Sequence, residues 1–333
     1  MSGPLIGPLV GGIISHSLGW RWIFWITLII GGTSIFSVTL FVPETLRALV
    51  GNGSGYANPT PFQFVARRQG KLDEKKIQAI KETQGPRPRM NFFSPFLYLM
   101  EPDVFVMLMF SAFIYMSMYS FMTSTTKQLS MRYGLSELEI GFCYLCMGSG
   151  TIIGGLIKGK MLDKDFRKVN EEACLKNPDQ KEVEICFYKA RLSSCWVSLF
   201  FSDVLPIVYG WCLQKNTHLA IPLILQFLTG VSNASLTICI QSLLIDLFPG
   251  KGASITASNN LTRCILGAIA SSVIDPGIEG VGVGWMFTII GLLVTLLNIS
   301  IPVLLKFGPR WRAQRIERLK QNNGQLTFRF FKH

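Results

Sequence analysis

Three ionisable side chains lie inside long apolar stretches, where a charge is costly and is a functional candidate by default. Asp203 lies eleven residues into the run that begins at Leu192, roughly 16 Å along a helix at 1.5 Å per residue. A carboxylate near the middle of a membrane suits a carrier of protons. The alternative is structural: Asp203 hydrogen-bonds Ser202 or a hydroxyl group of a neighbouring helix.

The other two charges are Asp246, near the end of one apolar run, and Arg263, about ten residues into the next. Only the short turn Pro249–Gly252 separates these runs, so they form antiparallel neighbouring helices. We therefore predict an ion pair between Asp246 and Arg263. The alternative is a role in gating the substrate or the proton.

Aromatic and amide side chains supply further polar groups within or beside apolar runs. Together they can line a cavity for varied ligands, in which cations stack on aromatic rings. Equally, aromatic rings can face lipid while amides bridge helices. The predicted cavity residues are Tyr115, Tyr119, Gln226, Asn233, Gln241, Asn259 and Asn260.

The residues of metal and covalent chemistry do not converge. Cys143 and Cys146 form a CxxC pair, but it lies in an apolar run, and the three His residues are elsewhere. We predict no metal site, no redox pair and no cofactor. No phosphate-binding loop, nucleophile elbow or dinucleotide fingerprint occurs, so an enzyme is not expected.

The elements that carry these residues are apolar runs of transmembrane length. The chain of 333 residues is 49% hydrophobic and 16% charged, whereas a soluble protein is about 25% charged. A span needs about 20 apolar residues. Seven runs qualify, and Leu5–Leu18 is expected to be a partial eighth: Ile23–Val42, Val104–Thr126, Leu138–Ile157, Leu192–Leu213, Ala220–Leu244, Ala253–Ile274 and Trp285–Leu305.

The basic residues predict the orientation of these spans. Of 32 Lys and Arg residues, 27 lie in the two large loops, the Pro249–Gly252 turn and the C-terminal tail, and four lie in the alternate connections. Cytoplasmic loops carry the excess of positive charge, so both large loops and the C-terminus are expected in the cytoplasm. The net charge of +12 is then explained by anionic lipid headgroups, and we expect no binding of nucleic acid.

The spans predict an all-α integral membrane protein with four regions. Residues 1–42 would be two helices of an N-terminal bundle, 43–103 a cytoplasmic loop, 104–307 a six-helix bundle and 308–333 a basic cytoplasmic tail. Six helices after a long basic loop are typical of one half of a two-bundle transporter.

A Gly- and Pro-rich segment begins the chain: Gly3, Gly7, Pro8, Gly11 and Gly12 form the pattern GxxxGPxxGG. Glycines four residues apart let helix backbones approach closely, and a proline within a helix bends it. Spacing alone would fit a dimerisation face. The full pattern resembles the antiporter motif in the fifth helix of the major facilitator superfamily.

Other segments strengthen the resemblance. Gly159, Asp163, Arg167 and Lys168 resemble the loop between helices eight and nine, where a carboxylate and basic residues form a cytoplasmic latch. Ser232–Pro249 and Lys251–Arg263 resemble helices ten and eleven of the fungal drug:proton antiporters, in the quinidine-resistance and spore-wall dityrosine subgroup. Helices one to four of that family have no counterpart here, so we interpret the chain as an N-terminally truncated member.

The resemblance implies export of small organic molecules in exchange for protons by alternating access. Drugs, weak acids, amino acids, polyamines and dityrosine all fit, and the oligomeric state is open. The plasma membrane is the expected location, with the vacuolar and prospore membranes as alternatives. The rival hypothesis is a truncated product that does not transport and folds only with a partner or is degraded.

Overall fold

The computed structural model describes residues 3–44, 50, 58–69, 99–176, 187–192, 194–248 and 252–330. Within these ranges the regular structure is helical. Contacts between residues divide the chain into two compact units, residues 1–13 with 93–333 and residues 14–92.

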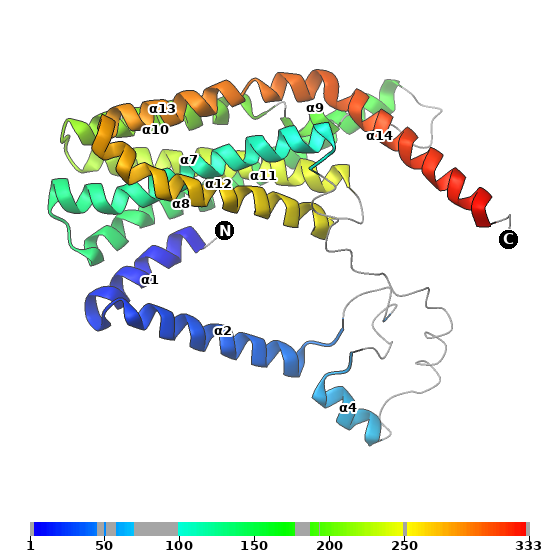
Figure 1. Cartoon of the computed structure of the whole chain (residues 1–333), viewed down its shortest axis with the longest axis horizontal. Helices are drawn as coiled ribbons and strands as arrows, with labels where there is room; N and C mark the ends of the chain where they lie inside the picture. The colour runs from blue at the N-terminus through cyan, green and yellow to red at the C-terminus, as the bar shows by residue number, and fades with distance from the viewer. Residues whose placement is uncertain are drawn as a thin grey trace. The chain divides into compact units, whose positions relative to one another are not determined.

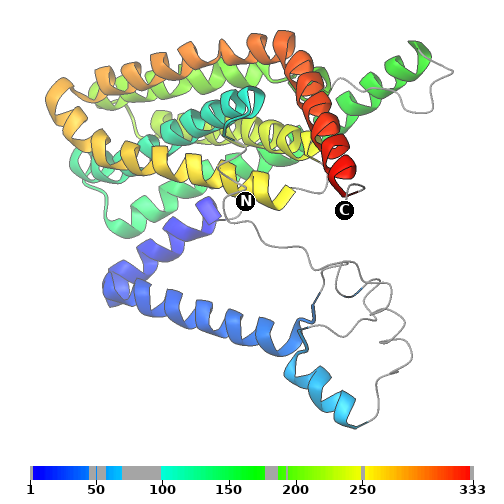
Figure 2. The same ribbon diagram turned by 45° about the vertical axis from the view of Figure 1, so that its right-hand side comes forward.

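The larger unit is a bundle of long helices that run alongside one another (Figure 1). The short helix α9 and the C-terminal part of α14 lie at one end of it (Figure 1), and Figure 2 shows this part of α14, in red, at the same end. The helices are α7 (Pro102–Tyr133), α8 (Glu137–Lys176), α9 (Phe187–Leu192), α10 (Trp196–Gln214), α11 (Ala220–Leu247), α12 (Gly252–Val281), α13 (Val283–Leu297) and α14 (Ser300–Phe330).

The smaller unit contains α2 (Arg21–Phe41), α4 (Pro61–Arg68) and the end of α1 (Gly3–Leu18). Thr60 caps α4, because its hydroxyl accepts the Gln63 backbone N–H while the Gln63 side chain accepts the Thr60 N–H. The Phe62 ring stacks on Phe41 at 5.5 Å between centroids, which joins α4 to the end of α2. Helix α2 buries none of its side chains, as suits an apolar helix surrounded by lipid.

Seven helices of the described chain are long and apolar enough to cross a membrane. They include every run predicted to span, and α1 forms over the predicted partial run. The last candidate span, Val283–Arg315, is interrupted near Asn298, where α13 ends and α14 begins.

Glycines bring α8 and α11 into close contact. A Cβ on Gly150 would lie 2.1 Å from the carbonyl oxygen of Phe227, and one on Gly154 would lie 2.5 Å from that of Val231. On the facing helix, a Cβ on Gly230 would lie 2.3 Å from the carbonyl oxygen of Met147. Small residues at such positions allow the backbone approach that drives helix association in membranes.

Large side chains fill the spaces beside α10 and α13. The Phe121, Tyr209 and Phe287 rings form one buried cluster, with Phe121 and Tyr209 4.2 Å apart between centroids. A second cluster joins the starts of α7, α9 and α10 to α11 and α14. The bundle therefore has one packed core around the start of α7 and a second, aromatic core further along α7.

Candidate functional site

A cavity of about 440 Å³ lies near the middle of α7, α8, α11 and α12. Ligand pockets are typically about 300–1,000 Å³. Its polar lining comes from Tyr115, Tyr119, Thr151, Asn233, Thr237 and Arg263, and its apolar lining from Pro8, Met118, Met122, Met147 and Ala234.

Three predicted cavity residues lie in this lining: Tyr115, Tyr119 and Asn233. The Tyr115 hydroxyl donates to that of Tyr119 at 3.1 Å, and the two rings are 4.6 Å apart. The other four predicted residues do not line the cavity. Gln226 is fully buried and donates to the Tyr209 hydroxyl at 3.5 Å, Asn259 is buried, Gln241 is half-buried and Asn260 is exposed.

The predicted ion pair between Asp246 and Arg263 is wrong. Asp246 Oδ2 accepts a hydrogen bond of 2.7 Å from Arg191 Nε of α9. Arg263 instead lies over the Tyr115 ring, with its Cζ 4.2 Å from the centroid. The helices are neighbours in sequence as expected, but α12 packs mainly on α7.

Asp203 joins two helices of the bundle. Its Oδ2 accepts a hydrogen bond of 2.6 Å from Asn298 Nδ2, at the break between α13 and α14. Its Oδ1 is buried and has no hydrogen-bond partner in the described part of the chain. Asp203 therefore has a fixed position and one carboxylate oxygen that can take a proton without losing a contact.

The Gly- and Pro-rich segment forms α1, and one of its glycines contacts α8. A Cβ on Gly12 would lie 2.8 Å from the Glu137 carbonyl oxygen, and one on Gly141 would lie 3.2 Å from the Pro8 carbonyl oxygen. Gly7 and Gly11 have open space beside them, and the side-chain environment of Gly3 lies outside the described residues. The close contact is thus made by Gly12 on Gly141.

The latch residues Gly159, Asp163, Arg167 and Lys168 all lie on α8, which continues through the segment expected to be a loop. Asp163, Arg167 and Lys168 are exposed, and no ion pair joins them within the described ranges. Sequence analysis missed Lys158, which directly precedes Gly159 on α8. It is 3% exposed, and its Nζ donates to the Ser194 carbonyl at 2.6 Å and the Ser194 hydroxyl at 2.9 Å.

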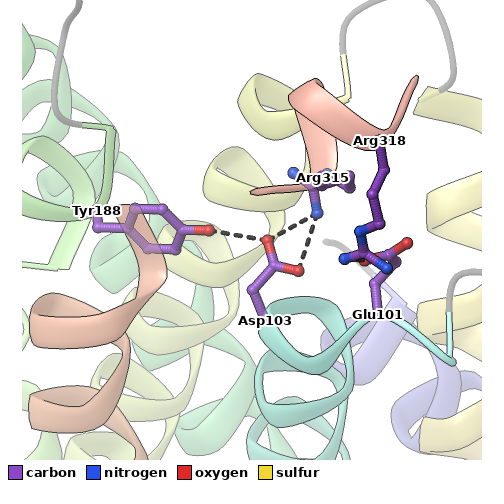
Figure 3. Close-up of polar contacts among 5 residues, drawn as sticks. All are labelled: Glu101, Asp103, Tyr188, Arg315 and Arg318. Carbon is purple, nitrogen blue, oxygen red and sulfur yellow. Dashed lines mark hydrogen bonds and ion pairs between the residues drawn. The ribbon is translucent and has the colours of Figure 1, made fainter. Parts of the chain in front are cut away.

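A second charged group, also missed by sequence analysis, lies at the start of α7. Asp103 is fully buried, and Figure 3 shows its carboxylate between Tyr188 of α9 and Arg315 of α14. Arg315 Nη1 donates to both carboxylate oxygens, at 2.9 and 2.7 Å, and the Tyr188 hydroxyl donates at 3.0 Å. We call Asp103, Tyr188 and Arg315 the α14 clamp.

Neighbouring contacts enclose the α14 clamp. The Arg315 guanidinium lies 4.3 Å from the centroid of the Phe248 ring, and Arg318 pairs with Glu101 at 3.2 Å. Burial raises the pKa of the Tyr188 hydroxyl above its usual range, and the adjacent Asp103 carboxylate raises it further. The sequence offered one signal, an Asp directly before the predicted span Val104–Thr126, but its partner lies in a basic tail that was assigned to lipid headgroups.

Comparison with known proteins decides the family. The model of the Major Facilitator Superfamily matches residues 1–272. The chain belongs to this superfamily. Its relatives include Citrate exporter 1 of Aspergillus niger, with 34% identity over 96% of the chain, and Quinidine resistance protein 1 of Saccharomyces cerevisiae, with 29% over 97%. The chain spans 62% of the length of each.

Membership of this superfamily confirms the family prediction. Together with the seven apolar helices of the described chain, it shows that the protein is an integral, multi-pass membrane protein of a transporter family. A further relative is Multidrug transporter QDR2 of Candida glabrata, with 30% identity over 98% of the chain and 60% of the relative.

Proposed function

We propose that the protein exports small organic molecules by alternating access, in exchange for protons, and that the mid-bundle cavity is part of its substrate site. The observation that carries this proposal is the cavity itself, because it combines rings, thioethers, an amide and a guanidinium midway along four helices. Substrate sites of such transporters lie near the bilayer midplane. The names of its relatives, which include a citrate exporter and multidrug transporters, support export of organic molecules.

Asp203 is the proposed proton carrier. Its free Oδ1 can accept a proton, and its other oxygen is tied to Asn298 at the break between α13 and α14. Protonation would make the Asp203 carboxyl group a weaker hydrogen-bond acceptor. It would therefore weaken the contact between α10 and Asn298, at the break between α13 and α14. An antiporter requires that binding and release of a proton change the positions of its helices.

Transport by reconstituted vesicles tests the proposal. The protein, purified from cells that express its own gene, is placed in vesicles that are more acidic inside than outside, and uptake of labelled naphthalene carboxylate, quinidine and citrate is measured. We expect the gradient to drive accumulation of at least one compound and collapse of the gradient to abolish it. Uptake of all three compounds that is no faster than in empty vesicles would contradict the proposal.

Asp203→Asn separates coupling from binding. We expect this variant to lose gradient-driven accumulation and to retain exchange of labelled for unlabelled substrate, because Asn keeps a partner for Asn298 but takes no proton. Ser202→Ala is the matched control, since this adjacent hydroxyl makes only a 3.5 Å contact to Asn233. Unchanged accumulation by Asp203→Asn would make Asp203 structural.

The flanking regions complete the proposal. We propose that residues 1–42 and 104–307 belong to the two bundles, joined by the loop 43–103, and that the loop and the tail 308–333 face the cytoplasm. We propose the plasma membrane as the location. The contact of Gly12 with Gly141 supports a role for α1 in sealing the bundle against proton leak.

A further inference from the structure

Among the described residues that line the mid-bundle cavity, Arg263 is the one cation. It is half-buried, its guanidinium stacks on Tyr115, and its Nε is buried without a hydrogen-bond partner in the described chain. A guanidinium that stacks through its face keeps its N–H groups at the edge. These donors are therefore free to bind a ligand.

Three carboxylates along the bundle have partners other than Arg263. Asp246 pairs with Arg191, and Asp203 accepts from Asn298. Asp275, further along α12, lies 3.9 Å from Lys127. Within the described residues, no carboxylate neutralises Arg263.

A cation at membrane depth without a counterion is costly, and carboxylate is the group that a guanidinium fork binds best. We propose that Arg263 binds the carboxylate of an organic anion whose apolar body lies against the Met and Tyr side chains of the cavity. The inference rests on the proposed function and names the class of substrate. It goes beyond the names of the relatives, because it predicts a single carboxylate on an apolar molecule.

The lining supports both halves of this ligand. Met118, Met122 and Met147 give a polarizable apolar wall that adapts to varied shapes. One guanidinium matches one carboxylate, whereas a tricarboxylate would bring two further negative charges against this wall. A cationic drug is disfavoured as well, because Arg263 already occupies the face of Tyr115 on which such a ligand would stack.

Gly267 keeps Tyr115 and Arg263 in this arrangement. It lies one turn after Arg263 on α12, and a Cβ there would lie 3.3 Å from the Tyr115 ring. The glycine thus lets the ring lie against α12, directly beside the guanidinium. The stacking of Arg263 on Tyr115 therefore depends on the absence of a side chain at Gly267 as well as on the two side chains themselves.

Equilibrium binding of three ligands with the same apolar body tests the inference. Naphthalene carboxylate, naphthylmethanol and naphthylmethylammonium are titrated into the full protein in discs of zwitterionic lipid, with citrate as a fourth ligand. We expect the carboxylate to bind on the order of tenfold tighter than the alcohol, as a charge-assisted hydrogen bond provides. The ammonium ion and citrate should bind more weakly than the carboxylate.

Variants assign this preference to Arg263. Arg263→Gln should bind carboxylate and alcohol equally, Arg263→Lys should keep part of the preference, and Lys215→Gln, which removes an exposed charge in the α10–α11 connection, should behave as the wild type. Unchanged binding of the alcohol shows that a variant is folded.

Two results would overturn the inference: equal binding of carboxylate and alcohol by the wild type, or a preference that survives in Arg263→Gln. Either result would leave vesicle transport, and with it the proposed function, intact. Conversely, a preference that depends on Arg263 in a protein that transports none of naphthalene carboxylate, quinidine and citrate would support the site and contradict the proposed transport.

Discussion

At the scale of single residues, the buried charges are satisfied in different ways. Asp103 has a guanidinium and a phenol as partners, Asp203 has an amide, and Arg263 has an aromatic face. The first is a complete structural site, because both oxygens of Asp103 accept hydrogen bonds from Arg315. The other two keep free polar atoms, as ligand or proton binding requires.

Removal of one charge from the α14 clamp should destabilise the protein. Asp103→Asn leaves Arg315, which is 6% exposed, without a countercharge, and loss of one partner of a buried pair costs about 3–5 kcal/mol. The double variant Asp103→Asn/Arg315→Met should recover part of this loss, because it removes both charges. The measurement is the free energy of unfolding in detergent.

The matched control is the same kind of comparison at a neighbouring pair, with Glu101→Gln and Arg318→Gln made singly and together. This neighbouring pair is exposed at Arg318, and such pairs contribute about 0–1 kcal/mol. If Asp103→Asn were no more harmful than Glu101→Gln, or if the double variant were no better than Asp103→Asn alone, the α14 clamp would not be the ion pair that we describe.

Tyr188 gives the α14 clamp a dependence on alkaline pH. The pKa of its hydroxyl is raised above the unfolded value of about 10, so the folded protein holds a proton that the unfolded chain releases. This contribution is complete below about pH 10 and decreases as the pH rises above that value. Melting temperatures measured across this range should fall more steeply for the wild type than for Tyr188→Phe, and parallel curves would contradict the assignment.

The sequence identifies costly charges but not their partners. Asp203 and Arg263 could be selected because their runs are apolar, whereas the partner of Asp246 depends on how each helix is rotated about its axis. That rotation places Arg191, 55 residues away in sequence, beside Asp246. Arg315 was missed for the same reason, since a basic tail gives no sign that one of its residues is buried.

At the scale of elements, hydropathy predicts helices well because a membrane requires each span to satisfy its own backbone. Each predicted run is helical over most of its length, with a break near Asn298 in the last one. The ends of the helices are less predictable. Helix α8 continues to Lys176 and α14 to Phe330. In α8, polar residues of high helix propensity such as Glu171 and Glu172 extend a helix that hydropathy alone would end.

Glycines set the distance between α8 and α11, and this contact should tolerate no side chain. In Gly150→Ala the new Cβ would lie 2.1 Å from a backbone oxygen of the facing helix, so the helices must separate. Overpacking of a core costs typically 1–3 kcal/mol, and we expect about 3 kcal/mol here because backbone cannot rotate away. Thermal unfolding in detergent measures the effect.

Gly159→Ala is the control for Gly150→Ala, since it lies on the same helix and has no atom of another residue within 4 Å of its Cβ position. Alanine favours a helix by about 1 kcal/mol over glycine, so this variant should be as stable as the wild type or more so. Equal stability of the two variants would mean that α8 and α11 are further apart than the structure places them.

At the scale of the whole molecule, the two ends of the bundle carry different chemistry. One end holds the α14 clamp, Lys158 and the pair of Asp246 with Arg191. The opposite end holds Lys127 with Glu279, and Arg132, whose guanidinium bonds the Leu213 carbonyl and Asn216. Most of the basic residues in the sequence flank the first end, and cytoplasmic ends carry such an excess.

We therefore predict that the α14 clamp faces the cytoplasm, and accessibility of introduced cysteines tests this. Lys215→Cys and Gln314→Cys lie at exposed positions at the two ends of the bundle. On intact cells a membrane-impermeant maleimide should label Lys215→Cys above the level of the parent protein, and Gln314→Cys only after permeabilisation. The reverse pattern would place the clamp outside the cell.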